Sequence, residues 1–430
     1  MLKIRNIDAK SNAFGGLNIF YPKLIKNDID KLIEQHTGGR HNRAEYSASQ
    51  IILGHVFSQL VGSQRLEDAH IYKNDLDNID GLEIPSSDTT SRYLRSLASK
   101  STVIPAKGEN VKPHIFNIND SMLDLLIEIA LKLKLVKKNA KNVLDYDNTI
   151  IGTKKWDATA TYLKNGRDLL YGYQPGVASL NGIPIYLENR SGHSNAGLNI
   201  DETVIRCIEK LKSHGIKINY FRSDAAAHNV KLLKYLYDNN IKFVVRYRSG
   251  VRNQLDVLDT FTQNWKETKV GRQDCAVTSV HREFIPSKQI YRIAFLRKDE
   301  KDTFRYFGLI TNIEDMTEEE LIHFYNQRGQ EEKRFADLKN NFNLKRLPFS
   351  LLEENTVFMI MSCIAYNIYQ YAVLTIKKVV KTLNPNIWLK TFRKTYLHHR
   401  IIIRSETGEF QFENLKPKYL ALFRRWWEIY

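Results

Sequence analysis

Between residues 143 and 248 the chain alternates apolar runs of strand length with amphipathic runs of helix length, and this order limits the possible folds most. The expected order is a strand, a β-hairpin, a helix, a strand, a helix and a strand: NVLDYDNTII, VASL with IPIYLE, ETVIRCIEKLKSHG, INYFRSD, HNVKLLKYLYDNN and IKFVVRYR. Asn181-Gly182 between two apolar runs is the strongest short-range signal of a hairpin. The order therefore predicts an α/β fold with a mixed sheet and helices packed on its faces.

The first 112 residues are expected to form a helical domain. In RAEYSASQIILGHVFSQLVG the apolar residues that share one helical face are Ile51, Ile52, Val56 and Leu60. Gly62 is a suitable end for this helix. The segment PSSDTTSRYLRSLAS opens with good N-cap residues and puts Arg92 and Arg95 on a second helix, which suits a DNA groove. A solvated surface helix explains either arginine equally well.

The remaining patterns divide the chain further. A linker is expected at 102–113, a helix at 119–136 and a strand-rich segment at 251–316. The domains expected are an N-terminal helical domain (1–112), the first part of the α/β core (113–250), a β-rich insertion (251–318), the second part of the core (319–376) and a basic C-terminal region (377–430). Residues 356–376 carry no charge and are long enough to span a bilayer. Because three polar residues dilute them, we interpret them as a buried core helix, with a membrane span as the alternative.

The charge of the chain indicates a polyanionic partner. The net charge is +16, which suits DNA, RNA or an anionic membrane. Half of it falls in residues 377–430, where the RRWW near the end either grips a nucleic-acid backbone or closes the fold. The three cysteines have no paired spacing and the N-terminus has no secretory pattern, so we expect a reducing cytoplasm and neither a disulfide framework nor a zinc site.

One stripe along a predicted helix carries a carboxylate, two cations and a phenol, side chains that suit the binding of a metal ion next to a phosphate. In LIHFYNQRGQEEKRFADLKNNF, at about 100° per residue, one narrow face carries Tyr325, Arg328, Glu332 and Lys339. The adjoining face is apolar, with Phe335, Leu338 and Phe342, and the far side, expected in water, carries Lys333, Arg334, Asp337 and Asn341. A solvated charged helix is the alternative for this motif taken alone.

Three aspartates are expected at strand ends of the mixed sheet. Asp145 and Asp147 project from the same face of one strand, and Asp224 ends another, at the sheet edge where ligands gather in such folds. An N-cap role is the alternative for Asp224. Three acids on neighbouring elements suit phosphoryl transfer with two Mg²⁺ ions, which prefer oxygen ligands. His193, in SGHSN, is expected to be a surface residue rather than a base.

These motifs resemble those of the DDE transposases of bacterial insertion sequences, in the branch defined by a Tyr-x2-Arg-x3-Glu-x6-Lys helix. Tyr325, Arg328, Glu332 and Lys339 match that spacing without a gap. The triplet DNT at 147–149 resembles the family's first-aspartate motif, and RSDAAA resembles the second. SQRLEDAHIYKND and PSSDTTSRYL resemble one subgroup of these enzymes. The resemblance implies an RNase H-like fold with a β-rich insertion between the second and third acids.

The resemblance also implies a site and a reaction. Asp147, Asp224 and Glu332 would hold two Mg²⁺ ions, with Mn²⁺ as a substitute, although Asp145 and Glu331 beside them leave the first and third ligands open. The side chains that would contact phosphates near the cleaved end are those of Tyr325, Arg328 and Lys339. Trp265 in the insertion either stacks on a displaced base or belongs to the core.

The activity implied is cut-and-paste transposition. The partners would be double-stranded DNA, both the terminal inverted repeats of the element and the target, and a second copy of the chain, with no membrane. The place of action would be the bacterial cytoplasm, at the nucleoid. The alternatives are a metal-dependent nuclease of the same fold without strand transfer and a non-catalytic DNA-binding derivative.

Overall fold

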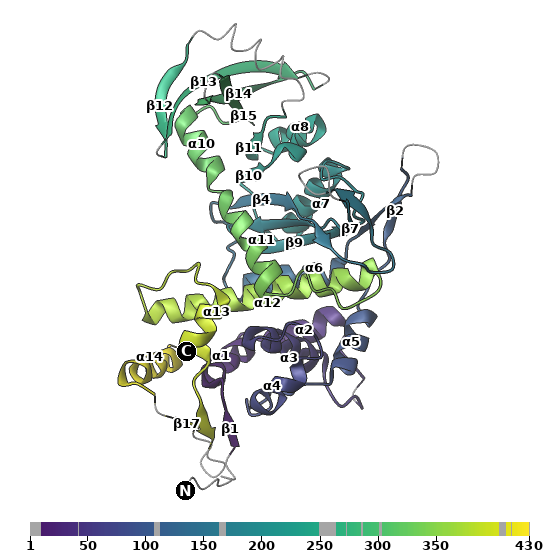
Figure 1. Cartoon of the computed structure of the whole chain (residues 1–430), viewed down its shortest axis with the longest axis vertical. Coiled ribbons are helices and arrows are strands. Elements are labelled where there is room, and N and C mark those ends of the chain that lie inside the picture. Colours follow the sequence, from purple (N-terminus) through teal and green to yellow (C-terminus); the bar gives the residue numbers. More distant parts are fainter. Residues whose placement is uncertain are drawn as a thin grey trace.

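The structure is a computed structural model of the 430-residue chain. It describes residues 10–41, 43–106, 112–162, 169–248, 264–271, 273–284, 287–300, 303–403, 410–413 and 415–429. Figure 1 shows one long helix lying between a set of N-terminal helices on one side and a large sheet on the other.

The N-terminal part is helical, as expected. It consists of β1 (Lys10–Asn12), α1 (Gly15–Lys26), α2 (Ile29–Thr37), α3 (Ala48–Val61), α4 (Ala69–Leu76) and α5 (Ser87–Ser96). Ser47 and Gln50 form a capping box at the start of α3, and Gly62 ends the helix with a φ of 125°. Ser86 caps α5 by accepting a hydrogen bond from Thr89 N. The predicted N-cap of α5 and the predicted end of α3 at Gly62 are therefore confirmed.

Helix α3 differs from the prediction in its burial. Instead of one apolar face, every residue of the helix except Gln50 is buried. The reason is its position, since α2, α4, α5 and the long core helix all pack on it. The buried set includes the polar residues Ser49, His55, Ser58 and Gln59, so the pattern of apolar residues alone does not reveal that the whole helix is enclosed.

The central sheet is mixed, which confirms the predicted fold class. Its strands are β2 (Thr102–Ile104), β3 (His114–Asn117), β4 (Val143–Asn148), β8 (Gly176–Leu180), β9 (Ile183–Arg190), β10 (Tyr220–Ser223), β11 (Lys242–Arg246), β12 (Lys266–Val270), β13 (Gln273–Phe284), β14 (Gln289–Glu300) and β15 (Thr303–Thr311). They lie in the order β12-β13-β14-β15-β11-β10-β4-β8-β9-β3-β2. β4, β10 and β11 run parallel to one another, and the other neighbours are antiparallel.

Five of these strands form the centre of the α/β core. Their order is β9-β8-β4-β10-β11, so the first strand in the chain, β4, lies in the middle. The helices α6 (Asp120–Lys132), α7 (Ile200–Ser213) and α8 (Val230–Asp238) accompany it. The β8–β9 hairpin turns at Asn181 and Gly182, whose φ angles are 49° and 90°, as an Asn-Gly turn of the primed type requires. The hairpin prediction is confirmed.

Two segments near this core depart from the prediction. The expected linker at 102–113 begins with β2, which pairs with β3 and so extends the sheet at one edge. Residues 151–173 hold a small separate sheet of β5 (Ile151–Gly152), β6 (Thr159–Tyr162) and β7 (Leu169–Tyr173), in the order β5-β7-β6. These strands have two to five residues each. Such short runs carry too little alternation to be recognised from sequence.

The β-rich insertion continues the central sheet. β15 pairs antiparallel with β11, with Val244 opposite Thr311, and β14, β13 and β12 follow outward. Figure 1 shows these strands at one end of the molecule, with α10 (Glu318–Asn326) packed against them. The insertion therefore carries its own strands while sharing the backbone hydrogen bonds of the core.

The long helix α12 (Leu352–Val379) is the centre of the fold. Among the described helices, α12 alone has the length and apolar composition needed to cross a membrane. However, 89% of its apolar 18-residue window is buried inside the protein. It packs on β9, α3 and α6, and α11 (Gly329–Asn341) lies across it. This burial agrees with the predicted core helix.

The C-terminal region packs against the N-terminal part of the chain. It contains α13 (Leu389–Phe392), the π-helical turn η2 (Arg393–Leu397), β16 (Ile401–Ile403), β17 (Phe410–Phe412) and α14 (Pro417–Glu428). β16 pairs with β1. Trp426 is fully buried and donates from Nε1 to Thr375 Oγ1 at 3.0 Å, whereas Trp427 is half exposed. One tryptophan of the RRWW therefore serves the core, and Arg424 and Arg425 are exposed.

Candidate active site

Two carboxylates lie at the ends of adjacent parallel strands. The pairing of β4 with β10 places Asp145 opposite Arg222 and Tyr146 opposite Ser223. Asp147 and Asp224 are the next residues on each strand, so they lie side by side where the strands end. Asp224 also accepts a hydrogen bond from Ala226 N at 2.9 Å, as the cap of the short helix η1 (Ala225–Ala227). The N-cap alternative is thus realised without removing Asp224 from this edge.

Arg328 faces the two carboxylates. Its Nη2 lies 2.9 Å from Asp147 Oδ2, and its side chain is 11% exposed. Burial disfavours the charged form, but Asp147, Tyr325 and Asp224 outweigh it, so the pKa of Arg328 is raised. Nε and Nη2 make no well-aligned hydrogen bond with the described part of the chain. This guanidinium retains donors for an oxyanion.

Tyr325 lies beside the same carboxylates. It is 8% exposed, and its ring meets Phe307 edge-on at 5.6 Å. Burial raises the pKa of the phenol, and the negative charges of Asp224 and Asp147 act in the same direction. The phenol is therefore a neutral hydrogen-bond donor at ordinary pH.

Lys339 reaches the same strand end from further along the chain. Its Nζ donates to Ile150 O at 3.2 Å, three residues beyond Asp147. Tyr325, Arg328 and Lys339, which were predicted to share a stripe, therefore all meet the carboxyl end of β4.

The stripe is carried by two helices instead of the one expected. α10 ends at Asn326, and α11 starts at Gly329, with Arg328 N bonded to Tyr325 O at 2.9 Å. Phe324 O, which would accept that bond in a continuous helix, accepts from Arg222 Nη1 at 2.5 Å instead. The side chain of Arg222 thus accounts for the break.

Glu332 is in the first turn of α11, four residues after Arg328, so the backbone places it on the same helical face. The side chains of Gln330, Glu331 and Glu332 lie outside the described part of the structure. The choice between Glu331 and Glu332 as the third acid therefore stays a prediction.

Asp145 has a different partner from Asp147. Arg222 holds both of its oxygens, Nε on Oδ1 and Nη2 on Oδ2, each at 2.7 Å. Both side chains are buried, at 2% and 6% exposed. Their charges are thus used within the fold. The sequence analysis missed Arg222, although Arg-x-Asp at 222–224 has the same spacing as Asp-x-Asp at 145–147 on strands predicted to be neighbours.

The far side of α11 corrects the expectation of a solvated face. Arg334 and Asp337 are half buried against α12, and burial lowers the pKa of Arg334 and raises that of Asp337. Asp337 accepts from Asn341, and Lys333 is exposed as expected. Arg334 and Asp337 line a hollow of about 330 Å³ together with Tyr366 of α12 and residues 384–388 of the loop that follows it.

His193 also differs from its prediction as a surface residue. It is half buried and stacks on His114, with ring centroids 4.4 Å apart. Its Nδ1 is bonded to Thr159 Oγ1 and its Nε2 to Lys112 O. With both nitrogens engaged, it holds the small sheet to β3.

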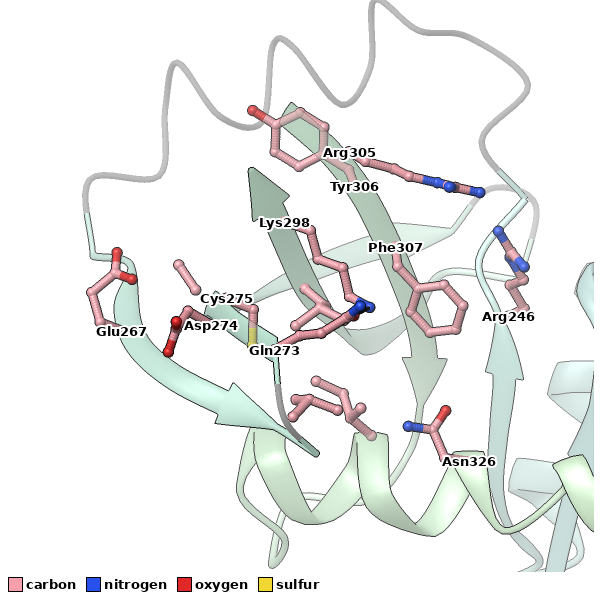
Figure 2. A pocket seen from close by; sticks show the side chains of 14 residues that line it. Arg246, Glu267, Gln273, Asp274, Cys275, Lys298, Arg305, Tyr306, Phe307 and Asn326 are labelled. Atoms are coloured by element: carbon pink, nitrogen blue, oxygen red, sulfur yellow. Dashed lines mark hydrogen bonds between the residues drawn. The ribbon is translucent and has the colours of Figure 1, made fainter. Parts of the chain in front are cut away.

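A cleft adjoins the site on the insertion side (Figure 2). It has a volume of about 760 Å³ and lies between the strands β12–β15 and helix α10. Figure 2 shows Lys298, Phe307 and Arg246 pointing into this space, with Asn326 of α10 below them. Arg246 lies 4.7 Å from the Phe307 ring and acts electrostatically on Tyr325. The cleft was not predicted, because its cations come from separate strands.

Trp265 does not reach this cleft. Its ring lies 4.6 Å from the Arg297 guanidinium. Leu296 and Lys298 line the cleft, and successive strand residues point to opposite faces, so Arg297 and Trp265 lie on the other face. Trp265 packs against the main hydrophobic core there, whereas Tyr325 belongs to a second cluster. This position favours the core alternative.

Arg92 and Arg95 lie on α5, as predicted, and both are exposed. Arg92 borders a surface hollow of about 460 Å³ shared with Arg40 and Tyr93. Arg95 lies 3.9 Å from Glu354 and 5.3 Å from the Phe349 ring, which ties α5 to the loop before α12.

The residues at the site fit a divalent metal. Carboxylate oxygens are the ligands that Mg²⁺ prefers, and Asp147 and Asp224 present theirs side by side. The Arg328 guanidinium lies against Asp147 as a counter-ion, which shows that this carboxylate favours a cation. Among the side chains that are described, no three His, Cys, Asp or Glu form a metal-binding group.

Comparison with known proteins identifies the family. A sequence model of the family described as transposase DDE domain group 1 matches residues 25–395. No curated protein matches the chain. A solved piggyBac transposase synaptic complex with hairpin DNA is 16% identical, with 91% of this chain and 80% of that chain covered and a TM-score of 0.41. The NurA nuclease from Sulfolobus solfataricus is 10% identical over 61% of this chain and 95% of that chain, with a TM-score of 0.21.

These two structural likenesses are too distant to assign a fold or a function. The family match is different in kind, since it covers most of the chain and includes both strand-end aspartates and α11. The chain belongs to the transposase DDE domain group 1 family and is a DNA transposase, from a family that uses a divalent metal.

Proposed function

We propose that this transposase cuts DNA at the ends of an insertion sequence and joins the freed ends to target DNA. Water first attacks a phosphodiester at the element end, which releases a 3′-hydroxyl, and that hydroxyl then attacks a target phosphodiester. The observation that carries the proposal is the pair Asp147 and Asp224 at adjacent strand ends, faced by the Arg328 guanidinium.

The carboxylates are proposed as metal ligands. Asp147 and Asp224, with Glu332 from α11, would hold two Mg²⁺ ions, or Mn²⁺ in their place. When bound, these ions supply the positive charge that activates the attacking oxygen and stabilises the leaving oxygen. Asp145 is left out of this set because its two oxygens are both bonded to Arg222.

The other residues of the stripe are proposed to bind the scissile phosphate. Arg328 has two buried nitrogens without a hydrogen bond in the described structure, and a guanidinium forks two such bonds to a phosphate. With Asp147 engaged as a ligand, Arg328 is released from its ionic partner and turns to the phosphate. Tyr325 donates from a neutral phenol, and Lys339 acts as a point charge further along the strand end.

The DNA path is proposed to include the cleft beside α10 and the exposed arginine Arg92. Arg246, Lys298 and Arg305 place three cations in the cleft, next to the helix that carries Tyr325. The element ends and the target are double-stranded DNA, and a homodimer would hold the two ends together. The proposed place of action is the nucleoid in the bacterial cytoplasm.

A cleavage and joining assay tests this function. The substrate is a duplex covering the DNA on either side of the coding sequence, incubated with Mg²⁺ and a supercoiled plasmid. Wild-type protein is expected to cut the ends and to produce joined plasmid, and Asp224→Asn is expected to bind the duplex without cutting it. Cutting without joined products would reduce the protein to a nuclease, and binding by wild type without any cutting would contradict the proposed activity.

A further inference from the structure

Trp156 is an exposed tryptophan that the proposed chemistry does not use. Its side chain is 88% exposed, and no other large hydrophobic side chain in the described parts of the chain exceeds 62%. It lies between β5 and β6, in the segment that follows Asp147 along the chain. An aromatic ring of this size loses favourable burial when it stands in water, so its exposure indicates a binding surface.

The turn that carries Trp156 is fixed on both sides. Lys155 Nζ donates to Pro348 O at 3.1 Å, and Ala158 N closes the turn onto Lys155 O at 3.1 Å. Asp157 accepts from Leu352 N at 2.6 Å, at the start of α12, and from the Tyr173 hydroxyl. The ring is therefore presented outward by a turn that is bonded to the core helix. A preorganised aromatic binds at a low entropic cost.

Cations adjoin this ring along the neighbouring loop. Lys154 is exposed next to the turn, and Lys345 and Arg346 are exposed in the loop that contains Pro348. Phe349, in the same loop, lies 5.3 Å from the Arg95 guanidinium of α5. The surface from α5 across residues 345–349 to Trp156 is named the Trp156 strip.

Three acids near the Trp156 strip have partners within the protein, and Asp88, in the first turn of α5, is exposed. Both oxygens of Asp157 accept hydrogen bonds. Glu353 accepts from Ser101 Oγ at 2.7 Å, and Glu354 lies 3.9 Å from Arg95. The strip therefore offers a surplus of positive charge around an aromatic ring. Cations that hold phosphates and aromatics that stack on bases are the combination used for nucleic acids.

We propose that the Trp156 strip binds the DNA of the element end, with its cations on phosphates and the Trp156 ring stacked on a base. The end is favoured over the target because the strip joins α5, in the predicted DNA-binding domain, to the segment anchored by Lys339 at Ile150. This inference rests on the proposed function. It adds a contact that acts in binding, away from the carboxylates that act in cleavage.

Binding measurements at several salt concentrations test the Trp156 strip. End duplex is titrated with Trp156→Ala, Trp156→Phe, Lys154→Gln and the control Trp388→Ala, a tryptophan that is 52% exposed just before α13. Trp156→Ala is expected to bind roughly 5- to 100-fold more weakly with an unchanged salt slope, since stacking is not ionic. Trp156→Phe retains most of the affinity. Lys154→Gln lowers the log–log slope by about 0.9.

The outcomes separate this inference from the proposed function. If wild type binds and cuts end duplex while Trp156→Ala binds as tightly as the control Trp388→Ala, the Trp156 strip is overturned and the proposed function stands. A loss confined to target capture by precut ends would also overturn it. If wild type itself fails to bind end duplex at any salt concentration, the proposed function fails with it. Because Trp156 is almost fully exposed, its replacement is expected to leave the fold intact.

Discussion

At the scale of single residues, two pairs on β4 and β10 have opposite roles because their surroundings differ. Asp145 and Arg222 face each other, and the pair is nearly inaccessible to water. Two residues further along each strand, on the same face, Asp147 and Asp224 face each other as like charges with Arg328 nearby. Two carboxylates side by side repel each other, so a cation between them is stabilising. The first pair therefore stabilises the sheet, and the second is suited to hold metal.

Replacing either carboxylate of β4 with an amide tests whether Asp145 and Asp147 have these different roles. Asp147→Asn is expected to abolish end cleavage while end binding stays near wild type, because the amide keeps the shape and loses the charge. Asp145→Asn is expected to lower the melting temperature, since it leaves the Arg222 charge buried without its partner. Cleavage assays and thermal unfolding of both variants distinguish them. Normal cutting by the Asp147→Asn protein would exclude this residue as a ligand.

Arg328 and Lys339 give a second residue-scale prediction. Arg328→Lys keeps the charge but loses the forked geometry, so end cleavage is expected to fall by about 10-fold or more, the effect of losing one hydrogen bond to a charged group. Lys339→Ala is expected to weaken cleavage and end retention. Neither should change the Mg²⁺ concentration for half-maximal activity as much as Glu332→Asp does. Metal titrations of the three variants measure this, and wild-type cutting by both cation variants would show that the stripe does not act on the scissile phosphate.

At the scale of elements, the junction of α10 and α11 aims the stripe at β4. Arg222 donates to Phe324 O in the last turn of α10, where a positive charge also favours the helix dipole, and its guanidinium lies 4.8 Å from the Phe324 ring. The next helix then starts anew at Gly329. The break places Arg328 opposite Asp147 while α11 continues toward Ile150, where Lys339 is bonded.

Removing Arg222 should therefore affect both stability and catalysis. Arg222→Met is expected to destabilise the protein by about 3–5 kcal/mol, because Asp145 stays buried and charged. The double variant Asp145→Leu with Arg222→Met is expected to recover most of that stability in urea unfolding. It should still cut end DNA poorly, because the junction lacks its anchor. If the folded double variant cuts end DNA with full activity, the Asp145–Arg222 pair does not position α10 and α11.

Local signals explain which elements the sequence predicts. The β8–β9 hairpin depends on Asn181 and Gly182 alone, and the cap of α3 depends on residues within one turn, so both are readable. The break between α10 and α11 depends on Arg222, about 100 residues away, and no local pattern contains it. The order of acids and cations at the site follows from strand ends and helical spacing. Their actual partners depend on packing, as Asp145 and Trp265 show.

At the scale of the whole molecule, positive charge and structural closure share the C-terminal region. α14 buries Phe423 and Trp426 against the core, and β16 pairs with β1 near the other end of the chain. Arg424 and Arg425 lie between these two buried residues in the sequence and are exposed to solvent. A truncation at residue 376 would remove core side chains together with charge, so it does not isolate the role of the charge.

Replacing the exposed Arg424 and Arg425 with neutral residues isolates the role of their charge. Arg424→Gln with Arg425→Gln leaves Trp426 and its bond to Thr375 in place, so the melting temperature is expected to stay within a few degrees of wild type. If α14 lies on DNA, the log–log salt slope of DNA binding should flatten by about 0.9 for each phosphate that is no longer neutralised, or about 1.8 for the two arginines.

Truncation at 376, in contrast, is expected to yield unfolded protein. Titrations on end duplex between low and moderate salt measure the slope. An unchanged slope in the folded double variant would assign the charge of α14 to another purpose and leave the DNA path to α5, the Trp156 strip and the cleft beside α10.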